Sequence, residues 1–296
     1  MLDMDKQSSF VTIDELYKIF DFEFKGNSKN IQNLGVIQSK SKNLLTFAEN
    51  EKFLDSALKQ DNISTIITKN YPKFDTEKTL ILSDSPRHLF YQIHSHLVET
   101  SFYGKKLPNS ISKTAQIHPT VVLADNNVII KDNVIIDSFV SIYKNCIIDE
   151  GVNIKSNTVL GGTGFQSYLH ENKRIPVPHA GGVHIEKNVN IGANTCIEEG
   201  LFRDFTRVGK YSQIDNLVLV GHGTEIGQNT VLTASSTLGG SCVLGDNVFV
   251  GLSGTIKNGV TIGSNSTIGM GAAVVKDVPN NTTVIGNAIR SASHST

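Results

Sequence analysis

Aliphatic residues recur every six positions through most of the chain beyond residue 130. The period is unbroken from Val208 to Val274, and shorter runs extend from Ile130 to Leu160 and from Ile185 to Ile197. A period of six fits neither the turn of an α-helix nor the alternation of a long strand. It fits short strands joined by tight turns, three of which close a triangular coil of about eighteen residues. Aliphatic positions then stack inside the coil, and Gly or Asn relieves strain at its corners. The sequence therefore predicts a left-handed parallel β-helix.

The six-residue pattern breaks twice. Residues 161–184 read GGTGFQSYLHENKRIPVPHAGGVH, and residues 198–207 read EEGLFRDFTR. Insertions in a repeat protein become loops on one face, and that face is often the binding face. Each break is therefore either a functional loop or a tolerated surface insertion.

The first part of the chain lacks the period and predicts a separate small α/β domain. We expect this domain over residues 1–108, the β-helix over 109–290 and a tail over 291–296, with residues 105–112 as the linker. Thr12 and Glu15 form a capping box before one helix, and Ser85-Pro86 opens another. The expected apolar faces of these helices are Leu16, Ile19 and Phe20, and Leu89, Ile93 and Leu97. Two segments predict short buried strands, STIIT at 64–68 and TLILS at 79–83.

Composition disfavours several classes of partner. The net charge is -1, so no basic field attracts nucleic acid or an anionic membrane. The chain has neither a leader with a basic start nor an apolar run long enough to span a membrane, so we expect a soluble, cytoplasmic protein without stable membrane insertion. Cys146, Cys196 and Cys242 lie far apart, without zinc-site spacing, and are interpreted as buried reduced thiols. We expect no metal site and no bound cofactor.

His222 is the strongest catalytic candidate, because it stands between Gly221 and Gly223, which leave its ring accessible. Gly240 follows eighteen residues later, one coil above, where its N–H would meet an oxyanion near the ring. Asn258, another coil above, is a further polar contact. Because an imidazole titrates near neutral pH, it suits proton abstraction from an amine or hydroxyl during acyl transfer. The alternative is a solvated corner histidine.

Other polar residues are open to two interpretations. Asp215, seven residues before His222, either orients the ring or is a solvated corner residue. His179 and His184 flank the first break and are candidates for substrate contact. His88, His94 and His96 fall on a predicted helix and are expected on its surface.

Four motifs in order resemble the bacterial UDP-3-O-(3-hydroxyacyl)glucosamine N-acyltransferases of lipid A biosynthesis. They are GGTGF (161–165), IPVPHAGGVHI (175–185), NIGANTCIEEGLFRDFTRVG (190–209) and IDNLVLVGHGTEIG (214–227), and the resemblance extends over about residues 10–275. It implies a homotrimer with acyl-binding grooves between neighbouring β-helices. It also implies that His222 is the general base, that Asp215 assists it, and that Gly240 supplies the oxyanion-hole amide.

The segment LTFAENEKF (45–53) is similar to the uridine pocket of that family. The resemblance implies that Phe47 and Phe53 sandwich the uracil and that Asn50 bonds its edge. Without the resemblance, both phenylalanines would be interpreted as core residues. Phe165, the last residue of GGTGF, is a further candidate for substrate contact.

Two features depart from the family. Its second histidine corresponds to Gly259, next to Asn258, and the ending GMGAAVVKDVPNNTTVIGNAIR (269–290) resembles hexapeptide sugar acetyltransferases that use acetyl-CoA. The sequence predicts acylation of the amine of a UDP-linked amino sugar, with a thioester of acyl carrier protein or CoA as co-substrate. The alternatives are an acetyl-CoA-dependent sugar N- or O-acetyltransferase and a non-catalytic β-helix with a binding role.

Overall fold

The computed structural model describes residues 9–27, 29–72 and 76–286, so the predicted tail at 291–296 and the end of the β-helix at 287–290 lie outside the described residues. The chain divides into two compact units, which are described separately. One comprises Met1–Lys105 with Phe165–Ala180, and the other comprises Lys106–Gly164 with Gly181–Thr296. The sequence-based division did not anticipate that a segment of the first break belongs with the N-terminal unit. Among the described residues, no helix has both the length and the apolar character to cross a membrane.

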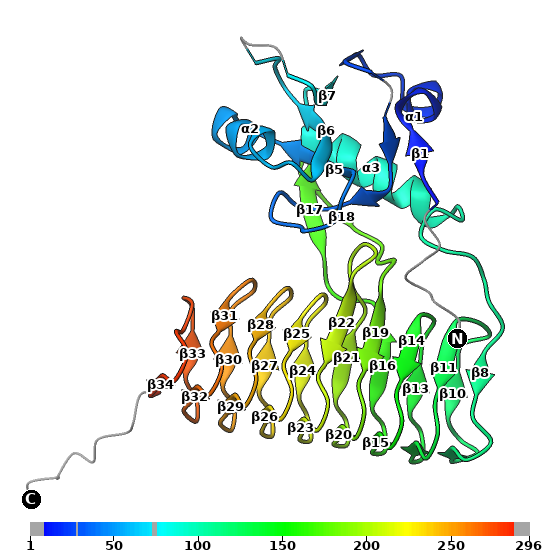
Figure 1. Cartoon of the computed structure of the whole chain (residues 1–296), viewed down its shortest axis with the longest axis vertical. Helices are drawn as coiled ribbons and strands as arrows, with labels where there is room; N and C mark the ends of the chain where they lie inside the picture. Colours follow the sequence, from blue (N-terminus) through cyan, green and yellow to red (C-terminus); the bar gives the residue numbers. More distant parts are fainter. Residues whose placement is uncertain (1–8, 28, 73–75, 287–296) are drawn as a thin grey trace, which may run out of the picture. The chain divides into compact units, whose positions relative to one another are not determined.

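The N-terminal unit is built around a five-stranded sheet with the strand order β2-β7-β6-β5-β4, in which only β2 runs antiparallel to its neighbour. Its strands are β2 (Phe24–Lys25), β4 (Asn33–Leu34), β5 (Leu44–Ala48), β6 (Ile63–Thr68) and β7 (Thr79–Leu82). A separate pair joins β1 (Val11–Thr12) to β3 (Asn30–Ile31). The helices are α1 (Ile13–Phe20), α2 (Glu51–Leu58) and α3 (Pro86–Val98). The predicted α/β domain and both predicted strands are therefore confirmed (Figure 1).

The helices begin where the sequence predicts. Thr12 and Glu15 form the reciprocal hydrogen bonds of a capping box at α1, and Pro86 is the first residue of α3. Along α3 the predicted apolar face is buried, at Leu89, Ile93 and Leu97. In α1, Leu16 is fully buried, but Ile19 is 52% exposed in the last turn, so the apolar face of that helix is narrower than predicted.

A hairpin within the first break packs on α3. Its strands, β17 (Ser167–His170) and β18 (Lys173–Pro176), are antiparallel. Tyr168 stacks on Tyr91 with ring centroids 4.9 Å apart, and His170 stacks on His88 at 3.6 Å. These contacts explain why the hairpin belongs to the N-terminal unit.

His94 shows how the segment that follows the hairpin changes the predicted surface of α3. Its side chain is fully buried, with Nδ1 2.6 Å from the Tyr103 hydroxyl and Nε2 2.7 Å from the Pro178 carbonyl. This burial lowers the pKa of His94 to about 4. The prediction that His94 lies on the surface was wrong because the segment that covers it is distant in sequence.

The second unit is a parallel β-helix of three sheets, named S1, S2 and S3 in the order in which each coil visits them. S1 contains β8 (Ser110–Ile111), β11 (Val128–Ile130), β14 (Cys146–Ile148), β19 (Gly182–Ile185), β22 (Phe205–Val208), β25 (Glu225–Ile226), β28 (Val243–Leu244) and β31 (Thr261–Ile262). S2 contains β9 (Gln116–Ile117), β12 (Ile135–Ile136), β15 (Asn153–Ile154), β20 (Asn190–Ile191), β23 (Gln213–Ile214), β26 (Val231–Leu232), β29 (Phe249–Val250), β32 (Thr267–Ile268) and β34 (Thr283–Val284). S3 contains β10 (Val122–Leu123), β13 (Ser141–Ile142), β16 (Val159–Gly162), β21 (Cys196–Glu198), β24 (Leu219–Val220), β27 (Thr237–Leu238), β30 (Thr255–Ile256) and β33 (Ala273–Val274). Because β8 already pairs with β11, the β-helix begins inside the predicted linker.

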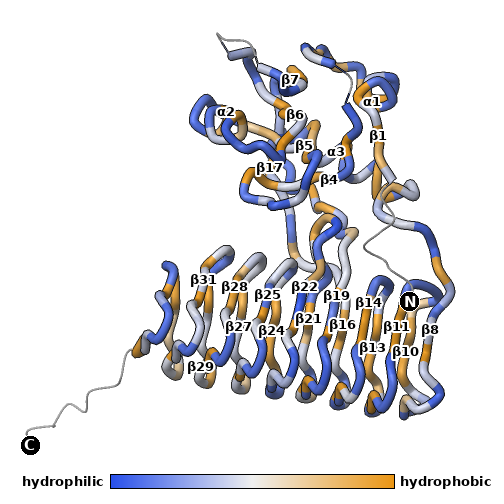
Figure 2. Tube along the Cα trace, in the orientation of Figure 1, coloured by the Kyte–Doolittle hydropathy of each residue, from blue (hydrophilic) through white to orange (hydrophobic). Residues whose placement is uncertain are grey.

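Aliphatic side chains form continuous ladders inside the β-helix. On S3, Val220, Leu238 and Ile256 occupy equivalent positions in successive coils, and each is at most 1% exposed. Figure 2 shows apolar residues repeated from coil to coil along the solenoid. Cys146 and Cys242 are buried in the same core, and Cys196 is partly buried. Many corner residues adopt positive φ, and most of those that are not glycine are asparagine, as the corner argument predicts.

Both breaks in the repeat occur at the corner between S3 and S1. The first lies between β16 and β19, and the second between β21 and β22. Both breaks therefore interrupt the S3–S1 corner of the β-helix, while the other two corners stay regular.

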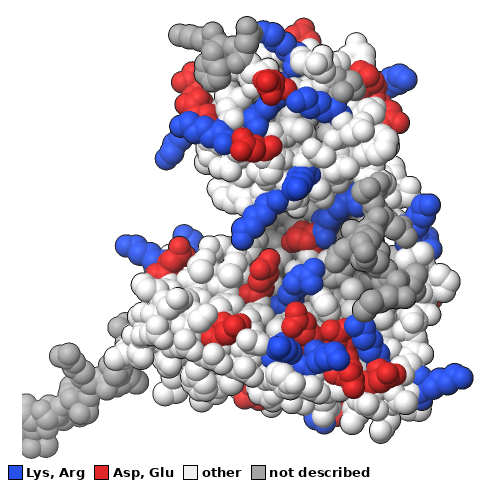
Figure 3. Space-filling model, in the orientation of Figure 1, with Lys and Arg blue, Asp and Glu red and all other residues white. Residues whose placement is uncertain are grey.

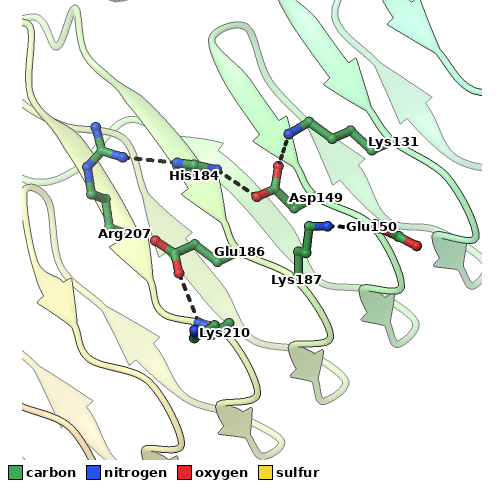
Figure 4. Close-up of polar contacts among 8 residues, drawn as sticks. All are labelled: Lys131, Asp149, Glu150, His184, Glu186, Lys187, Arg207 and Lys210. Atoms are coloured by element: carbon green, nitrogen blue, oxygen red, sulfur yellow. Dashed lines mark hydrogen bonds and ion pairs between the residues drawn. The ribbon is translucent and has the colours of Figure 1, made fainter.

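A chain of polar contacts crosses the coils on S1 beside these breaks. The Lys131 Nζ lies 2.6 Å from Asp149 Oδ1, and His184 Nε2 lies 3.2 Å from Asp149 Oδ2. Arg207 Nη1 donates to His184 Nδ1 at 2.9 Å, which leaves His184 Nε2 to donate to Asp149 (Figure 4). Figure 3 shows charged side chains gathered on the earlier coils of this face, while the later coils are mostly uncharged.

These contacts join coils whose spacing in sequence is irregular. Asp149 precedes the first break, His184 is the last residue of that break, and Arg207 is the last residue of the second break. Burial raises the pKa of Asp149, but hydrogen bonds from His184 and Lys131 outweigh that effect and hold it below its usual value. The network therefore stabilises the coil register across both insertions.

Replacement of Asp149 by Asn should lower the free energy of unfolding at pH 7 by about 1–3 kcal/mol. The lowered pKa means that the stabilisation is present above about pH 4 and is lost as the pH falls through the folded-state pKa. Denaturation curves from pH 7 downward should therefore show the difference between variant and wild type shrinking.

The matched control is Asp137→Asn, because Asp137 pairs with Lys155 at 3.3 Å but both side chains are more than one-third exposed. Such a surface pair contributes about 0–1 kcal/mol, so the control should change little. An Asp149→Asn variant as stable as the control at pH 7 would contradict the account of the network.

Candidate active site

His222 lies at the S3–S1 corner, directly after β24, and both neighbouring glycines are required there. Gly223 has φ +64°, a conformation that other residues rarely adopt. A Cβ on Gly221 would lie 2.6 Å from the Gly240 nitrogen, so any side chain there would collide with the next coil. The Gly-His-Gly sequence therefore fits the imidazole into a corner where two coils approach closely.

The backbone of His222 is held from both sides. Its N–H donates to Glu198 Oε2 at 3.0 Å, and its carbonyl accepts from the Ser241 N–H at 2.7 Å. The next N–H, of Gly223, donates to Thr206 Oγ1 at 2.8 Å. The ring is therefore attached to a rigid part of the coil, with 12% of its side chain exposed.

Gly240 lies directly against the imidazole. Strands β24 and β27 pair with Val220 opposite Leu238, which brings Gly240 into the coil position above His222. A Cβ on Gly240 would lie 2.4 Å from His222 Cε1 and 2.6 Å from His222 Nε2. Within the described part of the chain, the Gly240 N–H donates no recorded hydrogen bond. This amide is therefore available to an oxyanion beside the ring, and the catalytic roles of Gly240 and His222 stay predictions.

Glu198 is the carboxylate beside His222, and sequence reasoning missed it. Besides accepting from the His222 backbone, its Oε2 lies 3.5 Å from His222 Nδ1, and the Glu198 side chain is 16% exposed. The two residues are separated by 24 positions. The available signal was that Glu198 begins the second break, but the break itself disrupts the eighteen-residue count.

Asp215 does not lie beside the His222 ring of the same chain. It lies at the S2–S3 corner, where Oδ1 accepts from the Asn216 N–H at 2.7 Å and Oδ2 accepts from the Ala234 N–H at 3.1 Å. Seven residues that include the extended strand β24 lead from this corner to His222, a path of roughly 20 Å at about 3.3 Å per residue. Asp215 therefore caps a corner of its own chain instead of orienting the ring of the same chain.

Glu199, next to Glu198, is a buried acid. Its Oε1 accepts from Thr163 Oγ1 at 3.0 Å, and only 4% of the residue is exposed. Burial raises the pKa of Glu199 to about 7, and the Thr163 hydrogen bond and Lys144 oppose this only in part. The second break therefore places two carboxylates of different character side by side in sequence.

Above Gly240, the corner is open. Asn258 is exposed in the next coil, and its Oδ1 would lie 2.2 Å from a Cβ on Gly239. Gly259 has φ +73°, and a Cβ there would meet no atom within 4 Å. Space therefore exists at Gly259, but its backbone conformation disfavours a side chain. Among the residues that the structure describes, no group of three or more His, Cys, Asp or Glu could hold a metal ion.

The predicted uridine residues lie together in the N-terminal unit, at the end of β5 and the start of α2. Asn50 is the N-cap of α2, and its Oδ1 accepts from the Phe53 N–H at 3.0 Å. Phe47 packs against Phe90 with centroids 4.9 Å apart, while Phe53 is 44% exposed. An exposure of this size does not fit a core residue at Phe53, and the roles of Phe47, Asn50 and Phe53 in uridine binding stay predictions.

The remaining candidates differ in exposure. Phe165 is 93% exposed at the start of the hairpin segment, and His179 is 3% exposed at its end. Their roles in substrate binding stay predictions. His184 belongs to the polar network on S1, between Asp149 and Arg207, which gives it a structural role.

Comparisons with known proteins bear on the fold and on the family of the chain. Residues 127–162 match the family model described as bacterial transferase hexapeptide (six repeats), and residues 182–201 and 242–276 match the hexapeptide repeat of succinyl-transferase. A solved UDP-N-acetylglucosamine acyltransferase from Francisella novicida is 23% identical with a TM-score of 0.50, and the match covers 60% of this chain and 66% of that one. The predicted left-handed parallel β-helix is confirmed.

Several similar sequences carry the name UDP-3-O-acylglucosamine N-acyltransferase. The protein from Caulobacter vibrioides (strain NA1000 / CB15N) is 55% identical over 43% of this chain, a match that covers 38% of the relative. The proteins from Protochlamydia amoebophila and Campylobacter lari are 31% and 32% identical over 79% and 77% of this chain, and 74% and 77% of their own lengths are covered. These matches confirm the resemblance carried by the motifs: the chain belongs to the UDP-3-O-acylglucosamine N-acyltransferase family.

Proposed function

We propose that the chain transfers an acyl group from a thioester to the amine of a UDP-linked amino sugar. The observation that carries this proposal is the contact between the His222 ring and Gly240 in a member of an N-acyltransferase family. A base and a backbone donor then face one small volume at the S3–S1 corner. Family membership does not favour the two alternatives, a sugar acetyltransferase and a non-catalytic β-helix.

In the proposed reaction, the sugar amine attacks the thioester carbonyl and forms the new C–N bond while His222 Nε2 takes the proton from nitrogen. The carbonyl oxygen becomes an oxyanion, which accepts from the Gly240 N–H. Collapse of the tetrahedral intermediate breaks the C–S bond. The proton on His222 passes to the departing thiolate, so an amide and a thiol are formed and the base is regenerated.

The N-terminal unit would hold the nucleotide. Asn50 uses its Oδ1 for the helix cap, and its Nδ2 donates no recorded hydrogen bond among the described residues, so Nδ2 can donate to a uracil carbonyl. Phe53 offers a half-exposed ring, and Phe47 is braced by Phe90. Asn50 lies between Phe47 and Phe53 in the sequence. Two aromatic rings and an amide support recognition of a planar base.

Three bulky corner residues support assembly into a trimer. Phe139, Tyr211 and Leu217 have φ between 58° and 64°, at corners where asparagine is usual in this chain, and are 51–63% exposed. A left-handed conformation costs such residues about 1–2 kcal/mol. Burial against another copy would offset that cost. Phe139 and Leu217 share the S2–S3 edge with Asp215, so any role for Asp215 in catalysis is proposed only across such an interface.

The donor is either an acyl carrier protein thioester or a CoA thioester. Side-by-side turnover of the two distinguishes the N-acyltransferase of the family from an acetyl-CoA-dependent enzyme. A preference for acyl carrier protein supports the first, and a preference for acetyl-CoA supports the second. The cytoplasmic location expected from the sequence stays a prediction.

Replacement of His222 by Ala should lower kcat/KM for a UDP-amino sugar about 100- to 10,000-fold, because the general base is removed. Initial rates with acyl thioester donors measure this effect. His118→Ala is the matched control, since His118 is exposed at an S2–S3 corner and should be dispensable. Unchanged turnover by a folded His222→Ala protein would show that another group is the base.

Replacement of Phe47 or Phe53 by Ala should weaken UDP binding, by about 1–3 kcal/mol for each lost stacking face. Isothermal titration calorimetry with UDP measures the affinity. Tyr71→Ala, which removes an exposed aromatic ring elsewhere in the N-terminal unit, is the control. If both Phe variants bind UDP as tightly as the wild type does, the nucleotide lies elsewhere.

A further inference from the structure

A single carboxylate oxygen contacts two parts of His222. Glu198 Oε2 is 3.0 Å from the His222 backbone nitrogen, which donates to it, and 3.5 Å from Nδ1 of the same residue's ring. With 12% and 16% of the two side chains exposed, both groups are largely removed from water. A contact of this kind restrains the ring more than a solvent-exposed ion pair would.

The position of Glu198 follows from the path of the chain. Cys196 and Ile197 of β21 pair in register with Leu219 and Val220 of β24, so the two strands reach the S3–S1 corner together. The lower strand then enters the second break, and Glu198 lies beside the ring of the coil above. The carboxylate at the site therefore comes from the last residue of β21, where the regular strand gives way to the second break.

We propose that Glu198 is a positioning residue for His222, an inference that rests on the proposed function. Its carboxylate favours the tautomer in which Nδ1 carries the proton and Nε2 presents its lone pair. It also stabilises the imidazolium that forms when Nε2 takes the proton from the amine. A carboxylate behind a catalytic histidine has both effects in other acyl-transfer sites.

The geometry explains why this role falls to Glu198. Its Oε2 approaches the Nδ1 side of the ring. A Cβ on Gly240 would lie closer to Nε2, at 2.6 Å, than to Nδ1, at 2.8 Å. Gly240 therefore faces the Cε1–Nε2 edge of the ring, while the carboxylate oxygen approaches Nδ1. Asp215, whose two oxygens accept from Asn216 and Ala234, is committed to its own corner.

The test compares Glu198→Gln with Glu198→Asp in the full-length protein. Gln keeps the size of the side chain and an acceptor for the His222 N–H, but it removes the charge. We expect kcat to fall at least about 10-fold. Because the carboxylate favours the protonated ring, its loss should also move the acid limb of the kcat/KM profile to lower pH. A merely structural role would not move that limb.

Glu198→Asp keeps the charge and should retain an acid limb close to that of the wild type, with a smaller loss of kcat. It also keeps the test decisive if the Gln variant does not fold, because a folded Asp variant that keeps measurable activity but has its acid limb displaced to lower pH would overturn the proposal. Glu225→Gln, an exposed carboxylate three residues after His222, is the matched control and should behave as the wild type does.

The two proposals fail in different ways. If His222→Ala is inactive while Glu198→Gln has the wild-type kcat and an unmoved pH profile, the role of Glu198 is wrong and the proposed function stands. If His222→Ala is fully active, the proposed base is wrong. Loss of activity and a shifted limb in Glu198→Gln support both.

Discussion

The structure depends on the register in which one coil hydrogen-bonds to the next. Short parallel strands pair in S1, S2 and S3, and the inward aliphatic residues of each coil rest on those of its neighbours. The register therefore places each corner residue next to the equivalent residue of the neighbouring coil, independently of the side chains at these positions. Through this register, the pairing of Val220 with Leu238 also places the His222 ring against Gly240, the proposed base against the proposed oxyanion donor.

The glycines of the S3–S1 corner make that approach possible. Gly221 and Gly240 lie where a Cβ would press into the adjacent coil, and Gly223 has a positive φ. The breaks in the repeat act at the same corner. Glu198 ends β21 where the second break begins, and the polar network through Asp149 and His184 ties together the coils on either side of the first break. Site and scaffold are thus parts of one arrangement.

The six-residue period of the sequence predicts the fold and part of the candidate site. A strict six-residue pattern makes the positions of His222, Gly240 and Asn258 a matter of counting, because no insertion lies between them. Counting fails where the period breaks, so Glu198 was not found. It also misleads within one coil, since Asp215 is close to His222 in sequence but a whole strand separates their corners. The burial of His94 was missed for a different reason: Pro178, which contacts its ring, lies 84 positions further along the chain, just after the hairpin.

The central claim is that acyl transfer requires the close contact between the His222 ring and the Gly240 backbone. The most direct measurement is the kcat of Gly240→Ala, since its methyl group would lie 2.4 Å from His222 Cε1 and must displace the ring. Gly254→Ala is the control for a steric clash inside a coil, because its methyl group would press against Val250 at the S2–S3 corner. The account predicts a fall of about 100-fold or more for Gly240→Ala in a folded protein and little change for the control. A folded Gly240→Ala protein with the wild-type kcat would contradict it.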